Sequence, residues 1–274
     1  MAIEFNFMAK NKLENTYGSH VRWSLAKLLD VLRVHNTNVT FFITGSFYQQ
    51  FPELIRSIHE NGHEVAYHSH SHRHIETKEI LLKELADSAT FIREYSPRGF
   101  RAPYIYLPNG LLQVLRSHGF VYDSSTFASP GKRFEKDDMQ IFPVSSISYS
   151  WNRRSFPIYP KRLESRMFLR EIPLGCGIMV SWLRKSYSNI LQWYARRGIS
   201  FIFYLHLWQL FPPPDLKFDS WTDKVLCYPC KFPLVDVLQY FLSQNSFHRM
   251  DDLLCVPSLK TAAVAHHFLT LDLE

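Results

Sequence analysis

Val39-Thr-Phe-Phe-Ile-Thr44 is the stretch that decides the fold, and Gly45 closes it. A short apolar run rich in aromatic and β-branched residues is typical of a strand that is buried on both faces, as in a parallel sheet. We therefore expect a parallel sheet at the centre of the domain.

Helical patterns stand on both sides of this strand. Downstream, Pro52 occupies a position that the first turn of a helix tolerates, and the apolar stripe after it ends at Gly62. The next strand is predicted at 63–68. Upstream, apolar residues recur at helical spacing, at Val21, Leu25, Leu28 and Leu32.

The alternation of strands and helices continues along the chain. Thr77 is predicted to cap a helix that runs to about Tyr95, and further strands are predicted at 99–102 and 199–205. This order predicts a parallel α/β fold, either a barrel or an open doubly wound sheet. No glycine-rich phosphate loop follows a strand, so we favour the barrel, whose functional side chains lie at the carboxyl ends of the strands.

The composition limits the possible classes of function. The 274 residues are 46% hydrophobic and 20% charged, which predicts a globular domain. The longest apolar runs are shorter than the roughly 20 residues of a membrane span, and the first residues have no secretory signal, so we expect a cytoplasmic protein. Lys and Arg are spread along the chain despite a net charge of +6, so nucleic-acid binding is not predicted.

Four histidines alternate along 68–74, at His68, His70, His72 and His74. An extended backbone places all of them on one side, whereas a turn or a helical start pairs the first with the third. Neutral imidazole is a common zinc ligand, so both geometries are compatible with a metal site. The alternative is a His-rich surface loop, and the spacing alone does not decide between the two.

Several motifs, in this order and spacing, resemble the polysaccharide deacetylase family, also described as the NodB-homology or carbohydrate esterase family 4 domain. The resemblance covers about residues 1–255, and we expect a C-terminal tail at 256–274. The motifs are Thr40-Phe-Phe-Ile-Thr-Gly45, Gly62-His-Glu-Val-Ala-Tyr-His68 followed by His72, Gly99-Phe-Arg-Ala-Pro103, Gly119-Phe-Val-Tyr-Asp-Ser-Ser125, Phe203-Tyr-Leu-His-Leu-Trp208 and Phe247-His-Arg-Met-Asp-Asp-Leu-Leu254.

The resemblance implies a distorted (β/α) barrel of the glycoside hydrolase and deacetylase type. It implies removal of acetyl groups from an N-acetylated sugar or polysaccharide precursor with the help of zinc or another divalent metal. His68 and His72 would be metal ligands, His206 the general acid and Arg101 the residue that orients the catalytic base or a neighbouring carboxylate. Substrate contacts are expected from Pro103, Tyr104 and Trp208. His63 is expected to be structural and to bond to backbone.

One motif departs from the family pattern. Active members end their first strand in Thr-Phe-Asp-Asp-Gly or a variant such as Phe-Asp-Val-Glu, whose first Asp is the general base and whose other acid helps to hold the metal. The matching stretch is taken to be Ile3-Glu-Phe-Asn-Phe-Met8, which places Asn6 at the base position. An amide does not take a proton at neutral pH.

Three interpretations stay open on this basis. Glu4 or another histidine of the cluster has taken over the role of the base, or the N-terminal residues are not the native ones. The third is a deacetylase-like protein that binds carbohydrate or metal without turnover. The sequence does not identify the sugar or the oligomeric state.

Overall fold

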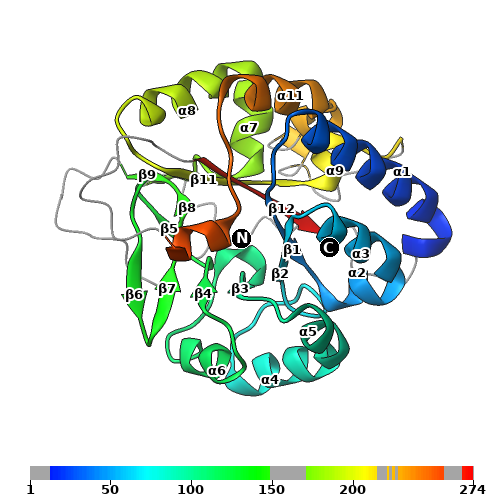
Figure 1. The fold of residues 1–274 in the computed structure, drawn as a ribbon, viewed down its shortest axis with the longest axis vertical. Helices are drawn as coiled ribbons and strands as arrows, with labels where there is room; N and C mark the ends of the chain where they lie inside the picture. Colours follow the sequence, from blue (N-terminus) through cyan, green and yellow to red (C-terminus); the bar gives the residue numbers. More distant parts are fainter. Residues whose placement is uncertain are drawn as a thin grey trace.

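The structure is a computed structural model that describes residues 13–148, 171–214, 221, 224–225, 228–255 and 267–273. A sheet of eight strands runs through its centre (Figure 1), in the order β11-β12-β1-β2-β3-β4-β7-β6. Neighbouring strands are parallel, except that β6 is antiparallel to β7. The strands are β1 (Thr40–Ile43), β2 (Glu64–Tyr67), β3 (Gly99–Phe100), β4 (Tyr122–Asp123), β6 (Phe134–Lys136), β7 (Met139–Ile141), β11 (Phe201–His206) and β12 (His267–Leu273).

Short strands cover the outer edge of β11. The backbone N–H of Ile202 donates to Ser145 Oγ at 2.9 Å, and the N–H of Tyr204 donates to the carbonyl of Gly175, also at 2.9 Å. The sheet therefore curls into a distorted (β/α) barrel, as the sequence predicted. The short strands are β5 (Phe127–Ala128), β8 (Val144–Ser145), β9 (Ile147–Ser148) and β10 (Glu171–Ile172).

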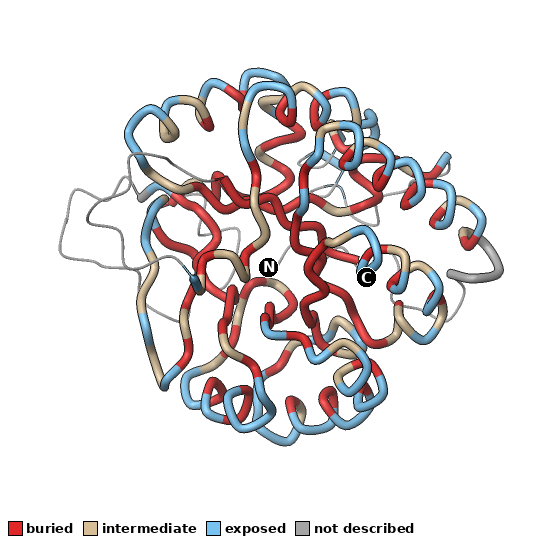
Figure 2. Tube along the Cα trace, in the orientation of Figure 1, coloured by how far each residue is buried: buried red, intermediate tan, exposed pale blue. Residues whose placement is uncertain are grey.

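Helices surround the sheet, with their inner sides buried and their outer sides exposed (Figure 2). Among the described residues, no helix is both long and apolar enough to cross a membrane. The α-helices are α1 (Leu13–Val34), α2 (Gly45–Gln50), α3 (Pro52–Glu60), α4 (Lys78–Asp87), α5 (Ala89–Tyr95), α6 (Leu112–Ser117), α7 (Gly177–Leu183), α8 (Tyr187–Ala195), α9 (Leu207–Leu210) and α11 (Val235–Gln244). The 3-10 helices are η1 (Pro103–Ile105), η3 (Arg184–Ser186), η4 (Tyr228–Lys231) and η5 (Met250–Cys255).

The described residues include a larger and a smaller apolar cluster. The larger cluster joins the outer face of the sheet to the helices, and alternate strand residues such as Phe41 and Phe203 belong to it. The smaller cluster lies inside the barrel and contains Phe42, Ala66 and Ile202. Side chains alternate between the two faces of a strand. Strand residues that lie an even number of positions from a member of the inner cluster therefore point into the barrel.

Residues 267–273 do not form a tail. They form β12, which pairs with β11 on one side and with β1 on the other. All seven residues are buried. The part of the predicted C-terminal tail at 267–273 therefore contributes a central strand, and its mostly apolar run fits a strand that is buried on both faces.

Several local predictions are confirmed. Thr77 caps α4 by accepting a hydrogen bond from the N–H of Ile80, and Pro52 stands at the start of α3. The predicted helix from Thr77 to Tyr95 is two helices, α4 and α5, which meet at Ser88. The hydroxyl of Ser88 at this break accepts a hydrogen bond from Tyr67 Oη at 3.0 Å, so the interruption serves a buried polar contact.

Candidate active site

Four polar side chains gather where parallel strands end. His68 follows β2, Arg101 follows β3, His206 is the last residue of β11 and Asp272 stands near the end of β12. His206 and Asp272 are directly paired across β11 and β12, and Asp272 is paired with Phe42 across β12 and β1. Paired residues on neighbouring strands point to the same face, so His206 and Asp272 share the barrel interior with Phe42.

Arg101 and Asp272 form a buried ion pair. Arg101 Nη1 lies 3.0 Å from Asp272 Oδ1, and the exposed fractions of the two side chains are 0% and 2%. A buried charge is stable only when it is paired and hydrogen-bonded, so each of these residues depends on the other.

The guanidinium group of Arg101 is fixed by further contacts. Nη1 donates to Thr270 Oγ1 at 2.7 Å, and Nη2 donates to Ser124 Oγ at 2.9 Å. The Arg101 Cζ atom lies 4.1 Å from the centre of the Phe42 ring, a cation–π distance. Arg101 therefore holds the Asp272 carboxylate in one position at the mouth of the barrel.

His68 and His72 lie next to one another, with ring centres 5.0 Å apart. His68 Nδ1 donates to the backbone carbonyl of Arg101 at 2.7 Å. A carbonyl only accepts, so Nδ1 carries the hydrogen. In the neutral ring Nε2 then carries the lone pair, which is the tautomer of a metal-binding histidine with an oriented ring. Among the described residues, no group of three His, Cys, Asp or Glu side chains is close enough to hold a metal.

His206 stands at the junction of β11 and α9. Its backbone N–H donates to Gln209 Oε1 in α9 at 3.0 Å. The ring stacks on Trp208 with a centre-to-centre distance of 5.4 Å. The orientation of His206 is thus fixed by the helix that follows it.

The residues predicted to contact substrate lie beside these groups. Pro103 and Tyr104 are in η1, directly after Arg101, and Tyr104 has a left-handed backbone with φ of 59°. The ring centre of Tyr104 is 5.2 Å from that of His72 and 3.9 Å from that of His74. The structure therefore brings Tyr104 to the two histidines, and Trp208 to His206.

Asn6 lies outside the described residues, so its assignment stays a prediction. Both edges of β1 are occupied, by β12 and by β2. Asp272 is the acidic residue that sequence reasoning missed. The signal was present, because Leu271-Asp-Leu-Glu274 is similar to the Phe-Asp-Val-Glu variant of the first-strand motif. Glu274 is outside the described residues as well.

Titratable residues at the opposite end of the strands have perturbed pKa values. Glu64, at the start of β2, accepts hydrogen bonds from Thr40 Oγ1 at 2.6 Å and Tyr122 Oη at 2.8 Å, and burial raises its pKa to about 7. His63 Nδ1 accepts from the backbone N–H of Val39 at 3.3 Å, and burial lowers the His63 pKa to about 4. The prediction that His63 is structural and bonds to backbone is confirmed.

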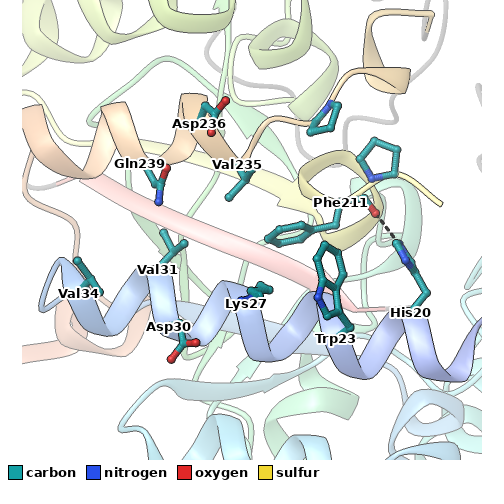
Figure 3. A pocket seen from close by; sticks show the side chains of 12 residues that line it. His20, Trp23, Lys27, Asp30, Val31, Val34, Phe211, Val235, Asp236 and Gln239 are labelled. Carbon is teal, nitrogen blue, oxygen red and sulfur yellow. Dashed lines mark hydrogen bonds between the residues drawn. The ribbon is translucent and has the colours of Figure 1, made fainter. Parts of the chain in front are cut away.

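A groove of about 810 Å³ lies between α1 and α11, away from these residues (Figure 3). Trp23, Val31 and Phe211 are in its wall, and His20 Nε2 is 3.0 Å from the carbonyl of Phe211. None of the predicted site residues that the structure describes lines this groove.

In a comparison with known protein families, residues 12–122 match the family model described as polysaccharide deacetylase. A peptidoglycan deacetylase-like protein of Gibberella zeae is 29% identical over 157 residues, which is 54% of this chain and 44% of the relative. The peptidoglycan-N-acetylglucosamine deacetylase of Bacillus cereus is 31% identical over 91 residues, 28% of this chain and 30% of that enzyme. The chain thus spans less than half the length of these relatives.

Among solved structures, a family 4 carbohydrate esterase from Streptomyces lividans is 27% identical, with a TM-score of 0.34. That likeness covers 37% of this chain and 55% of the esterase chain. The motifs at His68, His72 and Arg101 all fall inside the matched residues 12–122. Over this stretch the chain matches the polysaccharide deacetylase family.

Proposed function

We propose that the protein is a metal-dependent deacetylase that hydrolyses the acetamido group of an N-acetylated sugar. The observation that carries this proposal is the buried pair of Asp272 and Arg101 at the strand ends, in register with His206. The names of relatives, which include peptidoglycan and chitooligosaccharide deacetylases, support the class of substrate.

Asp272 is the general base of this proposal, in place of Asn6. A carboxylate can take a proton from the attacking water, which an amide cannot do, and proton transfer of this kind contributes about 10²- to 10⁴-fold to a rate. Arg101 holds Asp272 in position. The interpretation of binding without turnover was motivated by a missing carboxylate, and Asp272 provides one at this site.

His206 is the general acid of the proposal. When the C–N bond breaks, the nitrogen of the sugar leaves as an amine, and a histidine that titrates near neutral pH is suited to protonating it. The products are acetate and the free amino sugar. The stacking of the His206 ring on Trp208 in α9 orients it at this side of the site.

His68 and His72 are the proposed metal ligands, and Glu274 is the candidate for the acidic ligand because of its place in the Leu-Asp-Leu-Glu motif. The tautomer of His68 and the closeness of the two rings fit zinc, which binds imidazole and carboxylate groups. A bound divalent metal would polarise the acetyl carbonyl and lower the pKa of water. The cytoplasmic location stays a prediction.

The test is the release of acetate from N-acetylglucosamine oligomers and from peptidoglycan fragments, with purified zinc-loaded protein. We expect turnover that a chelator abolishes and that His206→Ala lowers by about 10²- to 10⁴-fold. Saturable binding of these sugars without acetate release would refute the proposed function. Equal rates for the wild type and His206→Ala would refute the role of the general acid.

A further inference from the structure

The loop after β2 carries both proposed metal ligands, and two of its residues have an unfavourable backbone. Ser69 has φ of 65° and His72 has φ of 53°, although neither is glycine. A left-handed backbone at such residues costs energy and persists only when the surroundings hold it. The contacts that hold residues 69–73 therefore decide where the two imidazoles stand.

The carboxylate of Glu84, which comes from α4, makes several of these contacts. Its Oε2 accepts the backbone N–H groups of His70 at 2.8 Å and Ser71 at 2.7 Å. Its Oε1 accepts from Ser71 Oγ at 2.8 Å and lies 2.8 Å from Arg73 Nε. The exposed fraction of Glu84 is 1%. Hydrogen bonds from backbone N–H groups to an ionised carboxylate are roughly twice as strong as neutral ones.

Backbone groups after β1 hold the other side of the loop. The N–H of Gly45 donates to the carbonyl of Ser69 at 2.9 Å, and the N–H of Ser46 donates to that of His70 at 3.0 Å. Inside the loop, the N–H of His72 donates to Ser69 Oγ at 3.2 Å. The loop is thus bonded through its carbonyls to residues 45–46 and through its N–H groups to Glu84.

We propose that Glu84 is a positioning residue for the metal, which acts by fixing the loop that joins His68 to His72. This inference rests on the proposed function. Glu84 contacts the backbone of His70 and Ser71, between the two ligands, and each bond fixes one peptide unit of that connection. A site whose ligands are already in place loses less conformational entropy when the metal binds, so Glu84 raises the affinity for metal.

The substitution that tests this role is Glu84→Gln, with Asp87→Asn as the matched control. The amide in Glu84→Gln keeps the size of the side chain but has only one acceptor oxygen, so it cannot accept all four groups. Asp87 is on the same helix, pairs with Lys83 Nζ at 2.8 Å and has a side chain that is 36% exposed. Both substitutions remove one negative charge from α4, but only one of them touches the loop.

The measurement is the zinc dissociation constant, obtained by competition with a chromophoric chelator, together with the thermal unfolding midpoint of the metal-free proteins. We expect Glu84→Gln to bind zinc about 10- to 100-fold more weakly, as for other residues that orient metal ligands, and Asp87→Asn to match the wild type. Hydrogen exchange should also become faster at the N–H groups of His70 and Ser71 in Glu84→Gln.

The outcomes separate the inference from the proposed function. A folded Glu84→Gln protein with the zinc affinity of the wild type would overturn the role of Glu84 and leave the deacetylase proposal standing. A wild-type protein that binds no zinc would overturn both. If Glu84→Gln and Asp87→Asn weaken zinc binding equally, the effect is long-range charge, and the positioning role is overturned.

Discussion

Replacing Asp272 by asparagine should strongly destabilise the protein, because Arg101 would then be buried without a counter-charge. The two side chains are 0% and 2% exposed, so water screens neither of them. With the N and O atoms 3.0 Å apart, the charge centres are about 4 Å apart, and at an effective dielectric constant near 20 they attract by about 4 kcal/mol. The other hydrogen-bond partners of the guanidinium, Thr270, Ser124 and Met250, are neutral.

We expect Asp272→Asn to lower the free energy of unfolding by about 3–5 kcal/mol, the usual cost of breaking a buried pair. The assay is urea denaturation followed by circular dichroism. The matched control is Asp252→Asn, which removes an equivalent contact at 3.0 Å to Arg249, where the side chains are 35% and 42% exposed. That exposed pair should contribute about 1 kcal/mol or less.

The reasoning would be refuted if Asp272→Asn unfolded within about 1 kcal/mol of the wild type, the upper value for an exposed pair. Such a result would mean that the carboxylate is not in the buried pair.

Two further predictions concern other parts of the barrel. Burial raises the pKa of Glu64 from 4.5 to about 7, so the folded protein holds this proton more tightly than the unfolded chain. The stability that this tighter proton binding contributes is present below about pH 4.5 and is lost as the pH rises to about 7. The loss in unfolding free energy over this range is about 3 kcal/mol. The difference in unfolding free energy between the wild type and Glu64→Gln should follow this curve, and a pH-independent difference would contradict it. Gly175→Ala should lower the thermal midpoint, because its Cβ would lie 2.5 Å from the carbonyl oxygen of Ile202 and 3.0 Å from the N of Ser145. Overpacking against such atoms costs about 1–3 kcal/mol. An unchanged midpoint in differential scanning calorimetry would show that the backbone of Gly175 does not pack closely against the edge of β11.

The parts of the fold that were predictable from the sequence are those with a local signal. The apolar run at 39–44, Pro52 and the capping Thr77 each determine structure through their immediate neighbours, and each stands where it was expected. The strand at 199–205 was found for the same reason. The closeness of His68 and His72 was predictable as well, because it follows from their spacing along one short loop.

The position of Asp272 was not predictable in this way. β12 comes last in the sequence, but it pairs with β1 and β11, and pairing between distant strands leaves no trace in either strand alone. The sequence alone therefore places the acidic motif at Asn6, near the other end of the chain. The Leu-Asp-Leu-Glu motif at 271–274 was readable, but its neighbours in the sheet become known only from the structure.

The measurement that tests the central claim most directly is the rate of acetate release by Asp272→Asn and by Asn6→Ala. Both should be compared with the zinc-loaded wild type on the same N-acetylglucosamine oligomers, at a temperature where circular dichroism shows all three proteins to be folded. We predict that Asp272→Asn lowers the turnover rate by about 10²- to 10⁴-fold and that Asn6→Ala leaves it unchanged. Full activity in Asp272→Asn, or loss of activity in Asn6→Ala alone, would contradict the assignment of the base to β12.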